Sequence, residues 1–304
     1  MKAFRDSALG LLLITGGLLG LTPPLGKMAV AGGASPLLWS LVISLGAGGV
    51  LFIVLAARRA MPMPSAHKLR YFFIGAVISY AVPNLLMFTA VPHLGAGYTG
   101  IMFTLSPVMT LALSLALGVR RPNLLGIAGI AVGFVGAVTV AITRGEAGAP
   151  AEPLWVVLGL LIPVSLAIGN IYRTVDWPED GAPTELAAGS HLAAAALLLV
   201  ALLVTGEADS VRLLADLPLV VLAQVLAAST MFFFFFRLQA VGGPVYLSQI
   251  GYVGAAVGLA IGVVFLGERY ALLTWIGAGI LTLGVVLTTK AQQQQERAER
   301  QLAG

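Results

Sequence analysis

Cysteine and charge are both scarce in this sequence. Among its 304 residues there is no cysteine, and Asp, Glu, Lys and Arg together make up 10% of the chain. The absence of cysteine is compatible with either redox environment, so it excludes no compartment. The scarcity of charge says more, because an average soluble domain is about 25% charged. So few charges cannot coat a globule of this size, which excludes an ordinary soluble domain.

Apolar residues take the place of charge and make up 59% of the chain. Runs without Asp, Glu, Lys or Arg recur, for example at 8–26, 37–57, 71–101 and 271–289. Each is long enough to cross a bilayer core of about 30 Å. The runs are unbroken rather than alternating with a period of two, which favours helices over the strands of a barrel. The sequence therefore predicts an all-α integral membrane protein.

Charges and turn residues divide the chain into ten predicted transmembrane helices. They lie at 7–27, 36–57, 70–91, 96–118, 122–143, 153–173, 184–205, 217–236, 244–266 and 271–289. With the N-terminus in the cytoplasm, thirteen of the seventeen Lys and Arg fall in cytoplasmic segments, and only Lys27, Arg144, Arg212 and Arg269 fall outside. This asymmetry follows the positive-inside rule and predicts that both termini are cytoplasmic. The basic residues also suit anionic lipid head groups, so no nucleic-acid partner is predicted.

The two halves of the chain repeat. At an offset of 148 residues, Tyr98 aligns with Tyr246 and Gly129 with Gly277. The repeat predicts a first five-helix unit at 1–145, a second at 153–290 and a polar cytoplasmic tail at 291–304. Because five is odd, the two copies enter the membrane from opposite sides. Inverted repeats around a central cavity are the architecture of alternating-access transporters.

One motif connects this repeat to a known family. LGERY, at 266–270, opens the last span and is followed by GAGILTLGVVL. This pattern resembles the EamA-type repeat of the bacterial drug/metabolite transporter superfamily, and the chain is most similar to its YddG-type exporters of amino acids. The first copy departs from the pattern, with Val119 and Arg120 where the second has Gly267 and Glu268. The resemblance implies a multi-pass protein of the bacterial inner (plasma) membrane that exports small metabolites.

Polar side chains within the spans are the candidate substrate contacts. Tyr80 and Asn84 are four residues apart and share a helix face, while Tyr246, Gln249 and Tyr252 follow one another at helical spacing. Tyrosine offers a ring and a hydroxyl, and the amides offer donors and acceptors, which together suit a zwitterion with an apolar side chain. The alternative is that these groups only join helices to one another.

Further candidates come from the fourth, sixth and seventh spans. Met102 and Ser106 follow Tyr98, and Ser165 lies one turn before a glycine, while Asn170 points away from it and is left out. His191 is the only histidine within a span, and a structural role competes with a proton-relay role there. The predicted substrate-binding set is Tyr80, Asn84, Tyr98, Met102, Ser106, Ser165, His191, Tyr246, Gln249 and Tyr252.

Two other residue types have simpler interpretations. Trp39, near the start of the second span, could close the cavity from its outer end, but interfacial anchoring is the favoured interpretation. Glycines at spacing of four, such as Gly129 and Gly133, indicate close helix packing.

No charged residue is predicted in the middle of any span, which argues against proton or sodium coupling and favours facilitated diffusion or exchange. The sequence shows no paired carboxylates and no metal-binding cluster, so it predicts no enzyme, no cofactor and no metal. The predicted partners are a small-molecule substrate and membrane lipid, with a monomer as one option. The alternatives left open are export of another small organic metabolite or drug, a channel or facilitator, and a receptor or scaffold.

Overall fold

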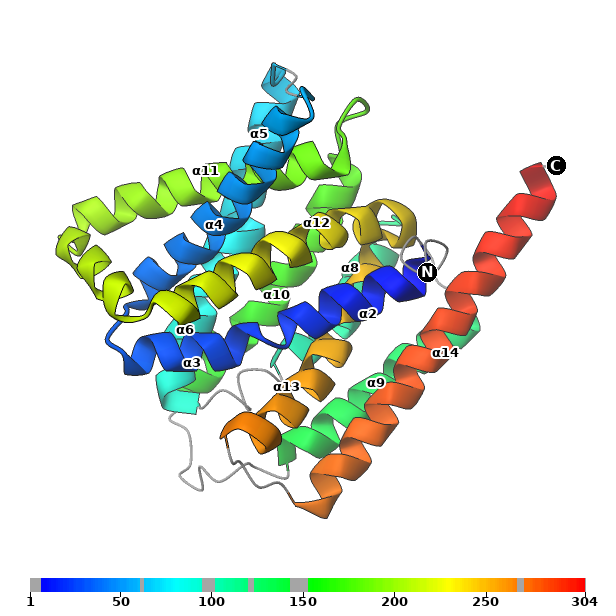
Figure 1. The fold of residues 1–304 in the computed structure, drawn as a ribbon. Helices are drawn as coiled ribbons and strands as arrows, with labels where there is room; N and C mark the ends of the chain where they lie inside the picture. The colour runs from blue at the N-terminus through cyan, green and yellow to red at the C-terminus, as the bar shows by residue number, and fades with distance from the viewer. Residues whose placement is uncertain are drawn as a thin grey trace.

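The fold is a bundle of helices. The computed structural model describes residues 7–60, 63–94, 102–119, 123–142, 153–266 and 271–303, and all regular structure within these ranges is helical. Figure 1 shows α9 and α14 lying side by side along one edge of the bundle. The described residues confirm the predicted all-helical class.

Several helices of the first half start at a serine cap or have proline in their first turn. They are α2 (Ala8–Leu19), α3 (Thr22–Ala31), α4 (Pro36–Ala57), α5 (Ala66–Gly75), the π-helix η1 (Ala76–Ala81), α6 (Val82–Leu94), α8 (Ser106–Ala116) and α9 (Leu124–Ile142). Ser35 Oγ accepts a hydrogen bond from the Leu38 N–H at the start of α4, and Ser65 Oγ accepts one from the Lys68 N–H at the start of α5. These caps satisfy backbone donors that a helix start leaves unpaired.

The second half contains one strongly kinked helix. Its elements are α10 (Pro153–Val175), α11 (Pro183–Val204), the 3-10 helix η2 (Ala208–Asp216), α12 (Pro218–Ser248), α13 (Ile250–Leu266) and α14 (Leu272–Ala303). Gly243 has φ 69° and ψ −178°, a conformation that a side chain disfavours, and Pro244 lacks an N–H. They kink α12 beyond the predicted end of the eighth span, so the residues predicted to connect the eighth and ninth spans belong to the helix.

Six helical stretches among the described residues are long and apolar enough to cross a membrane. They are Ala8–Ala31, Pro36–Ala57, Ala66–Ala90, Pro153–Val175, Pro183–Val204 and Pro218–Ser248. Met102–Ala116 and Leu124–Gly136 are shorter apolar helices. The count of ten spans and their inverted orientation therefore remain predictions. The predicted polar tail continues α14 as helix to Ala303, because its Gln, Glu, Arg and Ala are good helix formers.

The helix contacts are symmetric when the two halves are exchanged. In chain order, α2, α4, α5–α6, α8 and α9 correspond to α10, α11, α12, α13 and α14. The contacts of α2 with α12 and α13 match those of α10 with α6 and α8. The helices α4 and α9 each pack against their own counterparts, α11 and α14. This is the pattern that a two-fold relation between the halves would produce.

Glycine allows the closest of these approaches. A Cβ on Gly136 would lie 2.5 Å from the Leu281 backbone nitrogen, and one on Gly284 would lie 2.6 Å from the Gly133 nitrogen. A Cβ on Gly129 would likewise lie 2.8 Å from the Thr288 backbone nitrogen of α14. Contacts this short exclude any side chain, so the predicted packing role of Gly129 and Gly133 is confirmed.

Candidate functional site

The π-helix η1 positions the first candidate residue, Tyr80. A π-helix adds a residue to a turn and is frequent at functional sites. The turn is held from a neighbouring helix, because Ser165 Oγ of α10 donates a hydrogen bond to the Ile78 carbonyl at 2.8 Å. Ser79 and Tyr80 both lie on η1 and are both buried. The sequence-predicted Ser165 therefore braces the turn that carries the sequence-predicted Tyr80.

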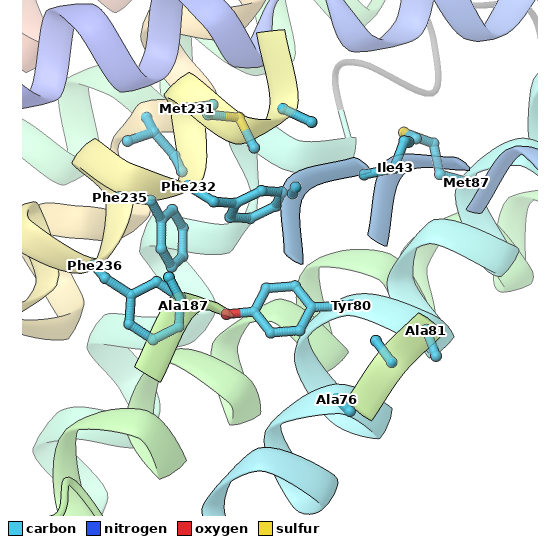
Figure 2. Packing of buried hydrophobic residues seen from close by; sticks show 14 of the residues in the cluster. Ile43, Ala76, Tyr80, Ala81, Met87, Ala187, Met231, Phe232, Phe235 and Phe236 are labelled. Carbon is cyan, nitrogen blue, oxygen red and sulfur yellow. The ribbon is translucent and has the colours of Figure 1, made fainter. Parts of the chain in front are cut away.

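Tyr80 belongs to an aromatic cluster built from three helices. Its ring centroid lies 4.1 Å from that of His191 on α11 and 5.4 Å from that of Phe232 on α12. The rings of His191 and Phe232 are 3.9 Å apart. Tyr80, His191 and Phe232 are 2%, 0% and 7% exposed, so the site is closed in this conformation. Figure 2 shows Tyr80 extending from its helix toward the phenylalanines of α12.

Buried polar atoms that have no hydrogen-bond partner among the described residues lie on the helices of this cluster. They are the Tyr80 hydroxyl, both ring nitrogens of His191, and the hydroxyls of Ser79 and Ser190. A buried polar group without a hydrogen bond costs about 1–3 kcal/mol. Several such groups on neighbouring helices would lower the stability of a core that had only a structural role. Together they can accept from and donate to a polar ligand placed among them.

Partnerless polar atoms also occur elsewhere on α4 and α12. Trp39 Nε1, Ser44 Oγ and both side-chain polar atoms of Gln224 are buried without a hydrogen-bond partner among the described residues. Trp39 is 0% exposed. The predicted interfacial anchoring of Trp39 is therefore wrong, because neighbouring helices cover the indole completely.

A buried arginine adjoins the aromatic cluster. Arg173 on α10 is 1% exposed, and its guanidinium carbon lies 5.7 Å from the Tyr80 ring centroid and 4.9 Å from that of Phe235. Its Nε donates to Gln239 Oε1 at 2.9 Å, and its Nη2 donates to Asn170 Oδ1 at 2.6 Å. Both acceptors are neutral amides. The guanidinium thus brings a positive charge to the edge of the Tyr80 and His191 cluster.

Ion pairs join the start of α5 to the loop between α10 and α11. Asp176 accepts hydrogen bonds from Arg70 at 2.5 Å and from the Tyr172 hydroxyl at 2.6 Å, and His67 lies 3.1 Å away. Burial alone would raise the pKa of Asp176, but the hydrogen bonds with Tyr172, Arg70 and His67 outweigh it and lower that pKa below its ordinary value. Asp176 is therefore an anion at neutral pH.

A second group of ion pairs lies beside the first. Lys68 Nζ lies 2.9 Å from Asp180 and 2.9 Å from Glu185, the latter in the first turn of α11. The hydrogen bond from Lys68 lowers the pKa of Asp180. Lys68 and Glu185 are 1% and 8% exposed, so this pair is well shielded from water. Lys68, Arg70, Asp176, Asp180 and Glu185 together form the structure that we call the ionic latch.

Aromatic rings fill the space between the ionic latch and the Tyr80 cluster. Tyr71 stacks on Tyr172 with ring centroids 5.9 Å apart and lies 6.3 Å from Trp177. Trp177 in turn lies 6.2 Å from Phe236, whose neighbour Phe235 lies 5.7 Å further on. The latch and this aromatic layer close the bundle at the end that is predicted to face the cytoplasm.

The structure does not bring all the predicted site residues together. Tyr80, Ser165 and His191 come together, and Asn84 is half-buried one turn beyond Tyr80. Met102, just before α8, and Ser106, the first residue of α8, are both buried. Tyr98 lies outside the described residues.

The predicted residues of the ninth span contact the fifth and tenth spans instead. The Tyr246 hydroxyl lies 3.1 Å from Thr289 Oγ1, and Gln249 accepts a hydrogen bond from Thr288. The Tyr252 hydroxyl donates to the Ile130 carbonyl at 3.4 Å. These side chains join the end of α12 and the start of α13 to α14 and α9 in this conformation, and their role as substrate contacts remains a prediction.

Sequence reasoning missed the residues that complete the cluster. They are Asn170, Arg173, Phe232, Phe235 and Gln239. Arg173 was interpreted as an orienting cytoplasmic charge, and Gln239 lay in a predicted connection between spans. The available signal was the spacing of Asn170 and Arg173. They lie three residues apart, which puts two polar side chains on the same face of an otherwise apolar helix.

Comparisons with known proteins agree with the fold and its two halves. The model of the EamA-like transporter family matches the chain twice, at residues 7–142 and 153–290. Among solved structures 28 chains match. One crystal structure of a protein has a TM-score of 0.66 at 19% identity, covering 94% of this chain and 98% of that chain. No curated protein matches the sequence.

The two family matches cover both predicted repeats with little left over. The family consists of membrane transporters of small solutes rather than enzymes, which agrees with the apolar helices and with the helix contacts that exchange between the halves. This chain belongs to the EamA-like transporter family and is a multi-pass membrane protein built from two EamA repeats.

Proposed function

We propose that this protein exports amino acids, preferring aromatic and large apolar side chains, across the inner membrane of a bacterium. One observation carries the proposal: the closed cluster of Tyr80, His191 and Phe232, in which buried hydroxyls and ring nitrogens have no hydrogen-bond partner in the part of the chain that the structure describes. An amino acid presents an ammonium group, a carboxylate and a side chain. The partnerless atoms suit the first two, and the aromatic rings suit an apolar side chain.

Alternating access is the proposed mechanism. Contacts of each half have counterparts in the other half, so one arrangement of gates can be exchanged for its symmetry-related arrangement. In the present conformation the ionic latch closes the end that is predicted to be cytoplasmic. Opening it requires α5 to separate from the α10–α11 loop and from the start of α11, which breaks the pairs of Arg70 with Asp176 and of Lys68 with Glu185.

We propose that transport does not depend on a proton gradient. The carboxylates of the ionic latch are in ion pairs at a helix end, and the Tyr80 cluster contains no carboxylate. Coupled carriers usually keep such a group near the middle of the membrane. Both termini are proposed to be cytoplasmic, on the strength of the positive-inside asymmetry.

The experiment is the flux of labelled L-phenylalanine in proteoliposomes that contain the purified protein. The proposal requires saturable and stereoselective uptake down the gradient of phenylalanine alone. It also requires counterflow, in which unlabelled phenylalanine on one side accelerates uptake of the labelled form. Linear flux without counterflow would indicate a channel. Flux of other small metabolites but of no amino acid would replace the proposed substrate class.

A matched pair of variants tests the site. Phe232→Ala removes a ring from the cluster, whereas Phe233→Ala removes a ring from the neighbouring, half-buried position on α12. We expect the first variant to lower phenylalanine flux far more than alanine flux, because the lost contact area matters most for a large side chain. The second should leave the ratio of the two fluxes unchanged. Equal ratios in both variants would move the site away from this cluster.

A further inference from the structure

Arg173 differs from the other deeply placed cation of the described chain. Lys68, also 1% exposed, forms ion pairs with Asp180 and Glu185. Arg173 has no ion pair within the described residues, and its charge faces the side-chain amide oxygens of Asn170 and Gln239 and the rings of Tyr80 and Phe235, none of which is an anion. Neutral amides orient a guanidinium but do not neutralise it. A buried cation without an anion is expensive, above all in a membrane protein, where such residues mark functional sites.

The guanidinium is held in one orientation by a network that spans three helices. Asn170 Nδ2 donates to Thr110 Oγ1 on α8 at 3.3 Å, which fixes the amide whose oxygen accepts from Arg173. Gln239 Nε2 on α12 donates to the backbone carbonyl of Asn170 at 3.0 Å and to Thr174 Oγ1 at 2.9 Å. Every member therefore has a defined position before any ligand arrives. Pre-organisation of this kind strengthens recognition, because little side-chain freedom is lost on binding.

Gly169 keeps the remaining edge of the guanidinium close to the Tyr80 cluster. A Cβ at Gly169 would lie 3.1 Å from Arg173 Nη1 and would collide with the Ser79 hydroxyl. The absence of a side chain there lets Ser79 approach Nη1 from η1. Ser79 Oγ is buried and has no hydrogen-bond partner among the described residues. A planar anion on this edge would meet both a fixed cation and a hydroxyl donor.

We propose that Arg173 binds the carboxylate of the transported substrate and makes a carboxylate the required feature of the substrate class. The inference deepens the proposed function, on which it rests, by assigning the charged group of the substrate at the same site. A guanidinium can form two parallel hydrogen bonds with a carboxylate. The Tyr80 hydroxyl and the unprotonated ring nitrogen of His191 then accept from the ammonium, and Phe232 and Phe235 contact the side chain.

This geometry ranks three compounds that share one ring. Phenylalanine carries the carboxylate, the ammonium and the ring that the proposed site binds. 3-Phenylpropionate keeps the carboxylate but lacks the ammonium. Phenylalaninamide keeps the ammonium but replaces the anion by a neutral amide. Because hydrogen bonds to charged groups are the strong ones, we expect loss of the carboxylate to weaken binding by about 10- to 150-fold. Loss of the ammonium should cost less, because its proposed acceptors are uncharged.

Binding is measured without transport, as the rise in thermal unfolding temperature of the purified full-length protein with each compound. The wild-type protein should bind phenylalanine and 3-phenylpropionate. It should bind phenylalaninamide about 10- to 150-fold more weakly than phenylalanine. Arg173→Gln should lose the preference for acid over amide, and Arg173→Lys should keep part of it. Arg237→Gln is the matched control, because Arg237 is a half-buried arginine outside the network and its change should leave the preference intact.

The outcomes separate the inference from the proposed function. Equal binding of acid and amide by wild type, no binding of either, or an unchanged preference in Arg173→Gln would overturn the role of Arg173. The wild-type comparison needs no variant, so a variant that fails to fold does not remove the test. A clear preference for the acid, together with absent phenylalanine flux in proteoliposomes, would support Arg173 as a carboxylate site and reject amino-acid export.

Discussion

Removing one partner of the ionic latch should open the closed end of the protein. Lys68 and Glu185 are 2.9 Å apart and are 1% and 8% exposed. Breaking a buried ion pair by deleting one member costs about 3–5 kcal/mol. We expect about 3 kcal/mol for Lys68→Ala, the lower end, because the latch lies at helix ends near water. When the latch is open, water solvates Glu185, so this cost falls on the closed state alone.

The expected shift is large enough to measure. Since about 1.4 kcal/mol corresponds to a factor of ten, the ratio of closed to open states should fall by about 100-fold. The chain has no cysteine, so a single introduced one reports without background. Ser190→Cys is suitable because Ser190 is buried next to His191 and its hydroxyl has no hydrogen-bond partner within the described ranges. A membrane-impermeant maleimide, applied to inside-out vesicles, reaches only the face predicted to be cytoplasmic.

Labelling of Ser190→Cys should be slow with the latch intact and on the order of 100-fold faster with Lys68→Ala. The double change Lys68→Met with Glu185→Leu should slow it again, because a buried ion pair replaced by apolar side chains of similar size usually keeps its stability. Ala29→Cys, fully buried on α3, controls for general unfolding and should stay unlabelled. An unchanged rate in Lys68→Ala, with the protein folded, would refute the role of the latch.

Further predictions concern pH, packing, substrate contact and topology. Because the folded-state pKa of Asp176 lies below its ordinary value of 3.8, its contribution is complete above that value and is lost only as pH falls through the lowered pKa. Relative to the labelling of a free thiol at the same pH, Ser190→Cys labelling should therefore be the same at neutral and at mildly acidic pH, and relatively faster labelling at mildly acidic pH would contradict this. Gly136→Ala should destabilise the protein by about 1–3 kcal/mol through overpacking, whereas Gly279→Ala, with open space around it, should not; thermal unfolding in detergent compares them. Tyr246→Phe removes the hydrogen bond to Thr289 and should cost about 1 kcal/mol of stability while leaving the KM for phenylalanine unchanged; a raised KM would instead make Tyr246 a substrate contact. A reporter fused to the C-terminus should report the cytoplasm, and a periplasmic signal would reject the proposed inverted repeat.

The helical membrane class and the two repeats could be predicted because both depend on local or periodic features. Runs of apolar residues identify helices without knowledge of their neighbours. The offset between halves needs only the sequence compared with itself. Tyr80 and His191 were found because a tyrosine and a histidine stand out within apolar spans. That they touch depends on the packing of η1 against α11, which no periodicity specifies.

Arg173 and Trp39 show where such reasoning fails. A basic residue at a helix end has the same sequence signature whether it faces lipid head groups or the interior. Asn170 lies one turn before Arg173 on α10, but Gln239 belongs to α12 and is brought to Arg173 only by the fold. Trp39 lies near a helix start, where anchoring and burial are again indistinguishable, and α4 has apolar residues on all sides. The interior face of such a helix is set by its neighbours, so only the assembled bundle reveals it.

The most direct measurement of the central claim is an experimental structure of the protein with phenylalanine bound. We expect the carboxylate at hydrogen-bonding distance from the Arg173 guanidinium and the substrate ring among Phe232, Phe235 and Tyr80. Phenylalanine bound instead between α9, α13 and α14, or at any place that leaves Arg173 in contact only with Asn170 and Gln239, would contradict the account.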